Sequence, residues 1–438
     1  MAFSSLRPLR SRNYALVWSS ALVSNVGSWV QTVALGTLVT LDQHNPFWTA
    51  FVMAAGFLPM GLLAPLGGML ADRLDRRRWL IATTVAEAAF AFLLAALVAG
   101  GHRSPWLLVV LSFVGSSAGS IGFPAYQALL PDLVEQEDLM AAVSLSSAQW
   151  NMGRVLGPAV AGVILVTWSP SMAFLVNGVS FGAVVIALSL VRVPSHPRAP
   201  SSEGVWHRLR EGARVAASEP SCRAAIILIA LLAIVISPFI GLIASLAIDG
   251  LHRRAGGPAT LTTAQGIGAV IGALALAPLA MKIGHRRVVT VSLVAVAVAV
   301  ILYGLSPTLP LAAIGIALVG GAYICVLSGL NTVVQLTAPE ASRGRVLSLF
   351  MMALGVLYPL GLMLQGEVAR IIGVRTMTVA SGLVMLAALG LVGLVSPSTF
   401  RALDTGVHRS VPDAAVAEVA EVDLAAGLRV EPDDPGTA

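Results

Sequence analysis

Long apolar runs, separated by short charged segments, dominate the chain. An α-helix needs about 20 mostly apolar residues to cross the hydrocarbon core of a bilayer, and the chain repeats runs of that length. The pattern predicts twelve membrane-spanning helices, at about residues 14–40, 47–71, 79–100, 105–130, 138–167, 171–191, 223–249, 258–281, 287–305, 309–336, 345–369 and 375–396.

The short charged turn between the second and third spans recurs later in the chain. Gly68–Arg78 is repeated about 209 residues on as Ala277–Arg287, and Gln127–Asp132 is repeated 208 residues on as Gln335–Glu340. Two repeats at nearly one spacing indicate a duplicated chain, which is how one class of secondary transporter is built. We therefore predict an all-α integral membrane fold of two parallel-repeat halves with six helices each.

The segments outside the spans complete the expected domain plan. The prolines of the central connection and the amphipathic stretch Trp206–Arg210 predict a flexible linker followed by a short helix on the membrane surface. The last segment has small residues, prolines and acids without a broad apolar face, which predicts disorder. The plan is an N-terminal segment 1–13, a half 14–191, a linker 192–222, a half 223–396 and a tail 397–438.

Composition and charge agree with a membrane protein. Of 438 residues, 57% are hydrophobic and only 11% are charged, whereas soluble domains are about a quarter charged. Twenty-one of the 27 lysines and arginines fall on the side of the 2–3 turn and both termini, five fall on the other side, and Arg154 lies within a span. The positive-inside rule therefore predicts a protein of the cell membrane with both termini on the cytoplasmic side. It also accounts for the net charge of +5, so the basic balance is not evidence for a nucleic-acid partner.

Residues for covalent or metal chemistry are missing from the pattern. Cys222 and Cys325 are isolated in or beside apolar segments, and the seven histidines fall in expected loops or tails, never two at ligand spacing. The sequence predicts no enzyme, no metal and no cofactor.

Arg154 is the most unusual polar residue inside a span, because it lies near the middle of the fifth. A charge at that depth costs about 2.5–3.5 kcal/mol on insertion scales, so it should face the bundle or a wet cavity. Asn151 and Pro158 share its helix face, and Gly153 and Gly157 belong to a small-residue stripe suited to close packing. Three roles stay open for Arg154: a structural brace, contact with the substrate, or ion coupling.

Further polar groups lie in the first, fourth and tenth spans. Asn25, Ser28, Trp29 and Thr32 share one face of span one, where a cavity-lining role is favoured over simple helix packing. Gln127 in span four and Asn331 in span ten lie nearer the expected cytoplasmic ends. Gate packing and ligand contact are equally compatible with these two positions.

Two acids lie within spans and could carry a proton. Glu87 is about eight residues from the expected cytoplasmic end of span three, and Glu367 is near the outer end of span eleven. Burial disfavours the ionised form of a carboxyl group, so either residue could exchange a proton. The alternative is an acid that reaches the membrane surface or is paired.

The turn between spans two and three resembles the loop signature of the major facilitator superfamily. The branch that the chain resembles most is the drug and siderophore exporters called transmembrane secretion effectors, through Leu9–Gln31, Pro124–Gly162 and Asn331–Val346. The likeness covers nearly all of residues 9–396. The positions that match the loop signature are Gly68, Leu70, Ala71, Asp72, Arg73, Arg76 and Arg77, and Asp75 stands where glycine is usual.

The resemblance implies roles for these motifs. Gly153, Gly157, Pro158, Ala161 and Gly162 match a span-five motif of exporters, which favours efflux over uptake. In the family, the loop residues form a gate on the cytoplasmic side, here Gly68, Asp72, Arg73, Arg76 and Arg77, with the aspartate near a helix N-terminus. The second-half signature carries Met281 in place of the aspartate, which implies asymmetric gating. Members often have an acid in span one, where this chain has Ser28.

Together these observations predict a secondary transporter that works by alternating access. We expect it to export an amphipathic drug, antibiotic or siderophore by proton antiport, through a cavity between the halves lined by spans one, four, five, seven and ten. A monomer in the lipid bilayer, with the small molecule and the proton as its partners, completes the prediction. An importer or uniporter is the first alternative, and a membrane sensor or scaffold that does not transport is the second.

Overall fold

Helices form all the regular structure in the described part of the chain. The computed structural model describes residues 6–191, 205–253 and 256–404, without the side chains of Asp72, Ala341 and residues 205–209. Within these residues, twelve helices or helix series are long and apolar enough to cross a membrane, as the hydrophobic pattern predicts.

Each half contributes six of these spans. The first half holds α1 (Arg12–Gln43), α2 (Pro46–Arg73), α3 (Arg76–Ala99), α4 (Pro105–Leu129), α5 (Leu139–Thr167) and α6 (Pro170–Leu190). The second half holds a composite seventh span of α8 (Pro220–Leu231), η4 (Leu232–Ile236), α9 (Phe239–Ser245) and η5 (Leu246–Gly250). It continues with α10 (Gly256–Ile283), α11 (His285–Leu305), α12 (Leu309–Thr337), α13 (Arg343–Ile372) and α14 (Val374–Val395).

Short elements connect these spans. A 3-10 turn, η1 (Arg7–Arg10), precedes α1, and the turns η2 (Leu130–Leu133), η3 (Gln136–Asp138) and η6 (Glu340–Ser342) lie between spans. The helix α7 (Val205–Ser218) precedes span seven, and α15 (Ser398–Arg401) follows span twelve.

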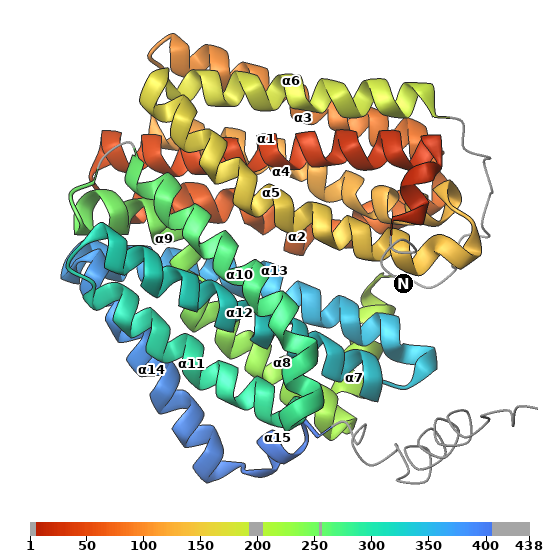
Figure 1. The fold of residues 1–438 in the computed structure, drawn as a ribbon, viewed down its shortest axis with the longest axis vertical. Helices are drawn as coiled ribbons and strands as arrows, with labels where there is room; N and C mark the ends of the chain where they lie inside the picture. The colour runs from red at the N-terminus through yellow and green to blue at the C-terminus, as the bar shows by residue number, and fades with distance from the viewer. Residues whose placement is uncertain (1–5, 192–204, 254–255, 405–438) are drawn as a thin grey trace, which may run out of the picture.

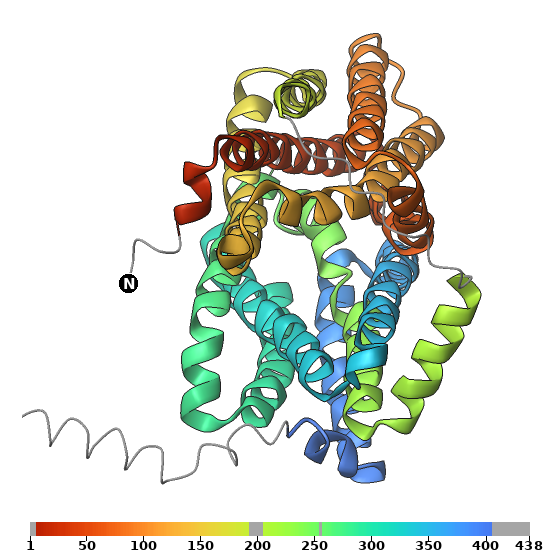
Figure 2. The same ribbon diagram turned by 90° about the vertical axis from the view of Figure 1, so that its right-hand side faces the viewer.

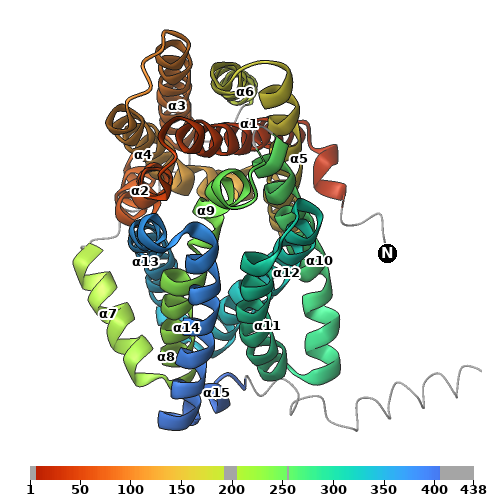
Figure 3. The same cartoon turned by 90° about the vertical axis from the view of Figure 1, so that its left-hand side faces the viewer.

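The two halves form separate groups of helices, the first above the second in Figure 1. Figures 2 and 3 view the molecule from its two ends, and both show the same division. Two pairs of long helices pack across the boundary, α2 against α13 and α5 against α10. The predicted fold class of two six-helix halves is therefore confirmed.

The sequence marks the beginnings of several helices. Proline occupies the first position of α2, α4 and α6, where its missing N–H leaves no intrahelical hydrogen bond unmade. Asp75 caps α3, because its Oδ1 accepts a hydrogen bond of 2.8 Å from the backbone N–H of Arg78. The residue that departs from the loop signature thus has a local structural role.

The turn α2–α3 lies at one end of the bundle, which we call the arginine-rich end because Arg73, Arg76, Arg77 and Arg78 belong to it. Tyr14 and Trp18 join α1 to α5 near this end. The Tyr14 hydroxyl donates to the Ala142 carbonyl at 2.8 Å, and the Trp18 indole N–H donates to the Leu145 carbonyl at 2.9 Å. The start of α1 is therefore fixed to the start of α5.

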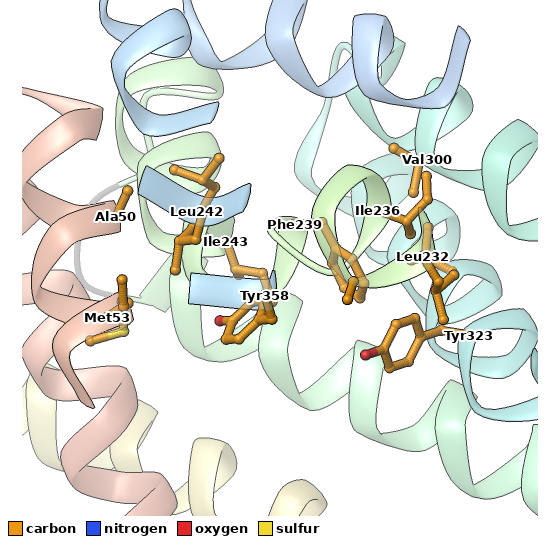
Figure 4. Packing of buried hydrophobic residues seen from close by; sticks show 14 of the residues in the cluster. Ala50, Met53, Leu232, Ile236, Phe239, Leu242, Ile243, Val300, Tyr323 and Tyr358 are labelled. Atoms are coloured by element: carbon orange, nitrogen blue, oxygen red, sulfur yellow. The ribbon is translucent and has the colours of Figure 1, made fainter. Parts of the chain in front are cut away.

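The boundary between the halves includes a very close backbone approach. A β-carbon on Gly61 of α2 would lie 2.5 Å from the carbonyl carbon of Gly355 of α13. Only a pair of residues without side chains permits this distance. Towards the end opposite the arginine-rich end, Ala50 and Met53 of α2 join the same buried cluster as Leu242 of α9 (Figure 4).

Span seven is interrupted by two π-helical turns, η4 and η5, with Pro238 directly after the first. Gln365 of α13 forms hydrogen bonds at this break, where its Nε2 donates to the carbonyls of Ile234 at 3.1 Å and Val235 at 2.7 Å. Polar side chains from neighbouring helices commonly satisfy carbonyls that a helix break releases.

The helix α7 packs beside α13, as Figures 2 and 3 show. Glu211 forms an ion pair with Arg345, and a β-carbon on Gly212 would lie 2.8 Å from the Arg345 carbonyl oxygen. Most of the linker, residues 192–204, and most of the tail, residues 405–438, lie outside the described residues. The boundaries of the domain plan stay predictions.

Candidate functional site

A cavity of about 1090 Å³ opens into the first half of the molecule. Its walls come from α1 to α6 and from the first turns of α13, with no described residue of α8, α9 or α12 among them. The sequence-based expectation of a lining from spans one, four, five, seven and ten is therefore wrong for spans seven and ten. The volume lies just above the range of about 300–1,000 Å³ that is typical of pockets for drug-sized ligands.

The cavity reaches the arginine-rich end, where Arg73 and Ala128 line it. At the opposite end, described residues of the two halves are in contact. His44 Nδ1 of α1's C-terminus lies 3.5 Å from Asp249 Oδ1, and a β-carbon on Gly366 would lie 2.3 Å from the Cβ of Ala50. The halves thus meet at one end while the cavity extends to the other.

Most of the wall is apolar, aromatic or thioether in character. Five of the chain's 13 methionines line it, and their flexible side chains adapt to ligands of different shape. These walls suit a bulky, mostly apolar molecule. The methionines are Met53, Met60, Met69, Met351 and Met352, and the aromatic residues are Trp29, Phe57, Phe90, Phe123, Tyr126, Trp150 and Phe181.

Glu87 and Arg73 are the two charged side chains that line the cavity among the described residues. Arg73 ends α2 and is exposed, whereas Glu87 lies within α3 against the backbone of α4. A β-carbon on Gly119 would lie 2.3 Å from Glu87 Oε1. Glu87 forms no hydrogen bond or ion pair with any described residue.

The polar stripe of span one lies on the cavity wall, which includes Asn25, Ser28, Trp29 and Thr32. Asn25 is only 7% exposed, and its Nδ2 donates to the carbonyls of Gln149 and Trp150 at 3.4 Å each. The stripe therefore both faces the cavity and holds α1 against α5.

The glycines of the exporter-like run allow α1 and α10 to approach α5. A β-carbon on Gly153 would lie 2.7 Å from the Asn25 amide group, and one on Gly157 would lie 2.3 Å from the Cβ of Trp29. Gly162 faces Ala259 of α10, where the corresponding distance is 2.9 Å, and Pro158 is buried within α5.

Arg154 does not line the cavity; it lies over Trp29, which does. The central guanidinium carbon is 5.6 Å from the Trp29 ring centroid, a distance at which a cation is attracted to an aromatic face. Its Nε is buried without a hydrogen-bond partner. Its backbone carbonyl lies at the boundary with the second half, 2.7 Å from where a β-carbon of Gly266 would be.

The expected gate arginines bind backbone and acid groups of the first half. Arg76 donates to the Ala128 carbonyl at 3.0 Å and to Asp132 Oδ2 at 2.9 Å. Arg77 donates to the carbonyls of Leu188 at 2.5 Å and Ser189 at 2.7 Å. Both contacts fix the start of α3 to the ends of α4 and α6.

Two further gate candidates lie in α2. Gly68 lines the cavity. Asp72 lies in the last turn of α2, and its side chain lies outside the described part of the structure.

Four other candidates lie away from this cavity. Gln127 is exposed, Asn151 donates to the Ser147 carbonyl at 2.9 Å, and Asn331 accepts from Gln335 at 2.5 Å. Glu367 is paired with Arg370 at the far end of α13, through bonds of 2.5 and 3.0 Å. No described group of three or more histidine, cysteine or acidic residues is arranged to hold a metal.

Reasoning from sequence did not select two buried tyrosines near the cavity, Tyr323 and Tyr358. Each is a single polar group in an apolar run, 4% and 6% exposed respectively. The Tyr323 hydroxyl lies 3.1 Å from Ser237 Oγ, and Tyr358 packs edge-to-face on the cavity residue Phe57. A tyrosine in the middle of a span was the available signal, but it does not say which residues the ring approaches.

The arrangement of the twelve spans is the fold of major facilitator superfamily transporters. The nucleoside transporter NupG superimposes with a TM-score of 0.71 at 14% identity, covering 89% of this chain and 98% of that one. A bacterial homolog of the human lysosomal transporter Spinster superimposes with a TM-score of 0.72 at 14% identity, covering 90% and 98% of the two chains. At these identities the likeness establishes the fold.

The chain belongs to the transmembrane secretion effector family, whose model matches residues 3–427. The resemblance read from the motifs is confirmed, and the protein is a multi-pass transporter of small molecules, not an enzyme.

Named relatives include multidrug efflux pump Tap of Mycolicibacterium fortuitum, 26% identical over 393 residues that cover 87% of this chain and 95% of the pump. The staphyloferrin A transporter of Staphylococcus aureus (strain NCTC 8325 / PS 47) is 29% identical over 175 residues, which cover 40% and 44% of the two chains.

Proposed function

We propose that the protein exports an amphipathic small molecule in exchange for protons, by alternating access across the cell membrane. The observation that carries the proposal is Glu87, a carboxylate without a described partner on the wall of a large apolar cavity. The arginine-rich end faces the cytoplasm in this proposal, because lysine and arginine concentrate there. The cavity then receives cargo from inside the cell.

Glu87 is suited to exchange a proton for a cation. An ionised carboxylate in apolar surroundings is costly unless a proton or another cation neutralises it. Since no described residue provides that charge, cargo and proton compete for one carboxylate. Competition of this kind couples the release of cargo to the uptake of a proton.

Glu367 is the weaker candidate for coupling. Its carboxylate is bound to Arg370 within the same helix, three residues away, and it lies outside the cavity. A paired acid at the far end of α13 meets neither cargo nor the cavity. The proton therefore passes through Glu87 in our proposal.

The names of the relatives support export of drug-like or siderophore-like cargo, since they include a multidrug efflux pump and a staphyloferrin A transporter. The methionine-rich and aromatic wall supports a cargo with a large apolar body. The carboxylate supports a cargo that also carries a positive charge.

The test is extrusion of rhodamine 123, a fluorescent lipophilic cation, from cells that produce the full-length protein. We expect energised extrusion that a protonophore abolishes. Glu87→Gln should reduce it about tenfold or more, because hydrogen bonds to charged groups contribute about 1.5–3 kcal/mol. Glu367→Gln is the control and should retain extrusion.

Accumulation of the dye above the level in cells without the protein would indicate uptake and contradict export. Extrusion that survives the protonophore, or that Glu367→Gln abolishes while Glu87→Gln does not, would contradict coupling through Glu87.

A further inference from the structure

A polar junction joins α1 to α6 at the cavity wall. Asn177 Nδ2 of α6 donates to Gln31 Oε1 of α1 at 2.9 Å, and both residues line the cavity. The Ser180 hydroxyl lies 2.7 Å from the Asn177 backbone carbonyl oxygen and 3.2 Å from Asn177 Oδ1. Asn177 and Ser180 are buried, and α1 and α6 are packed neighbours (Figure 3). The junction is therefore held from the α6 side.

Gly27 decides which end of the Asn177 amide group faces which part of α1. A β-carbon on Gly27 would lie 2.7 Å from Asn177 Oδ1. Glycine carries a hydrogen in that direction, which forms a weak C–H···O contact with an oxygen but would meet the hydrogens of an amide nitrogen. The Asn177 oxygen therefore faces Gly27, and its nitrogen faces Gln31, one turn further along α1.

This arrangement leaves the donors of the Gln31 amide group free for the cavity. Because Gln31 Oε1 accepts from Asn177, the atom that stays available is Nε2, with its two N–H groups. Gln31 Nε2 forms no hydrogen bond with any described residue, and it is not buried. Since Gln31 lines the cavity, its N–H groups are open to a ligand there.

Gln31 and Glu87 lie at a similar depth in the cavity. Gln31 is twelve residues before Gln43, the last residue of α1, and Glu87 is twelve residues before Ala99, the last residue of α3. Both helices run away from the arginine-rich end, so a donor and a carboxylate occupy comparable levels of a mostly apolar wall. A polar group on such a wall is costly unless water or a ligand binds it.

We propose that Gln31 is a specificity-determining residue, whose Nε2 donates to a neutral acceptor, such as a carbonyl oxygen, on the cargo. This inference deepens the proposed function and rests on it. The preferred cargo is then an apolar cation that also carries a carbonyl oxygen, with its charge at Glu87 and its oxygen at Gln31. Asn177 and Gly27 are positioning residues, because they act through the orientation of Gln31.

The experiment compares two cations that differ in one atom group. In (para-acetylbenzyl)triphenylphosphonium a carbonyl oxygen is present, and in (para-isopropenylbenzyl)triphenylphosphonium a CH₂ group replaces it. Both carry the same permanent charge. Their affinities for purified full-length protein in lipid nanodiscs are measured by displacement of tritiated tetraphenylphosphonium, with empty nanodiscs as the background. The quantity compared is the ratio of ketone affinity to alkene affinity.

We expect Gln31→Met to lower this ratio about two- to tenfold, as the loss of one neutral hydrogen bond implies. Gln31→Glu keeps the acceptor for Asn177 but presents an oxygen in place of Nε2, so it should lower the ratio as well. This second variant keeps the test valid where Gln31→Met folds poorly. Gln136→Met is the matched control, because Gln136 is exposed in η3 and does not line the cavity, and it should leave the ratio unchanged.

The proposal is overturned if the wild type binds neither cation, or if the Gln31 variants weaken both cations equally, which indicates a purely structural junction. An unchanged ratio with unchanged affinities also overturns it and indicates that water alone meets Gln31. A ratio that rises in Gln31→Met, or that falls equally in Gln136→Met, contradicts it too. A lowered ratio without protonophore-sensitive extrusion would support the role of Gln31 and refute the proposed function, whereas extrusion with an unchanged ratio would do the reverse.

Discussion

Replacing Gly355 with alanine tests how closely the two halves must approach. A β-carbon there would lie 2.7 Å from the Cα of Gly61 and 3.0 Å from its backbone nitrogen. Carbon atoms in favourable contact are about 3.5–4.0 Å apart, so α2 and α13 must separate by about 1 Å. Overpacking a close contact costs about 1–3 kcal/mol.

Alanine also has an intrinsic advantage over glycine inside a helix, of about 1 kcal/mol. Gly390→Ala is a matched control, because Gly390 lies within α14 and a β-carbon there would meet nothing within 4 Å. Both variants gain the same helix propensity, but only the β-carbon of Gly355→Ala would approach the backbone of another helix, α2. We therefore expect Gly355→Ala to be about 1–3 kcal/mol less stable than Gly390→Ala.

The assay is unfolding of purified full-length protein in mixtures of a mild detergent and sodium dodecyl sulfate, followed by tryptophan fluorescence. The predicted order is Gly390→Ala at or above the wild type and Gly355→Ala below Gly390→Ala. Equal stability of the two variants would refute the reasoning, because it would mean that the halves separate at this point without cost.

Two further predictions concern the first half. Arg76→Ala should lower the free energy of unfolding by about 1.5–3 kcal/mol, since it removes bonds to Asp132 and to the Ala128 carbonyl, whereas Arg78→Ala, at an exposed position, should be near neutral. The same unfolding assay measures both, and equal effects would argue against the ion pair. Gly157→Ala should displace Trp29, whose Cβ lies 2.3 Å from the new β-carbon, and weaken rhodamine 123 binding measured by polarisation. Gly182→Ala on α6, where a β-carbon meets nothing within 4 Å, should bind as the wild type does; weakening in both would show a general effect of alanine.

The fold was predictable because it depends on local properties of the chain. Span length and apolarity are properties of single segments, and the repeat of Gly68–Arg78 at Ala277–Arg287 divides the spans into two halves without any knowledge of packing. A break in span seven was predictable from Pro238, because proline cannot donate to the carbonyl of Ile234 four residues earlier. The partner of that carbonyl was not predictable, since Gln365 lies about 130 residues away.

The candidate site was only partly predictable. The face shared by Asn25, Ser28, Trp29 and Thr32 follows from helix periodicity, and the structure places all four on the cavity wall. The pairing of Glu367 with Arg370 could have been read from their spacing of three residues, which would have separated Glu367 from Glu87.

The position of Arg154 behind Trp29 could not have been read in this way. It depends on how closely α1 approaches α5 at Gly157, and the location of the cavity depends on how the halves lie relative to each other. Both are properties of distant segments, which hydrophobic periodicity does not record.

The helix α13 touches three different parts of the molecule along its length, and this gives it the geometry of a lever. Met351 lines the cavity, and Gly355 contacts α2 at the point that would act as the pivot. Gln365 donates a hydrogen bond to the interrupted span seven. At a rise of about 1.5 Å per residue, the arm to Met351 is about 6 Å and the arm to Gln365 is about 15 Å. If α13 tilts as one body, an ångström of movement beside the cargo becomes about 2.5 Å at the joint of span seven, at the opposite end of the helix.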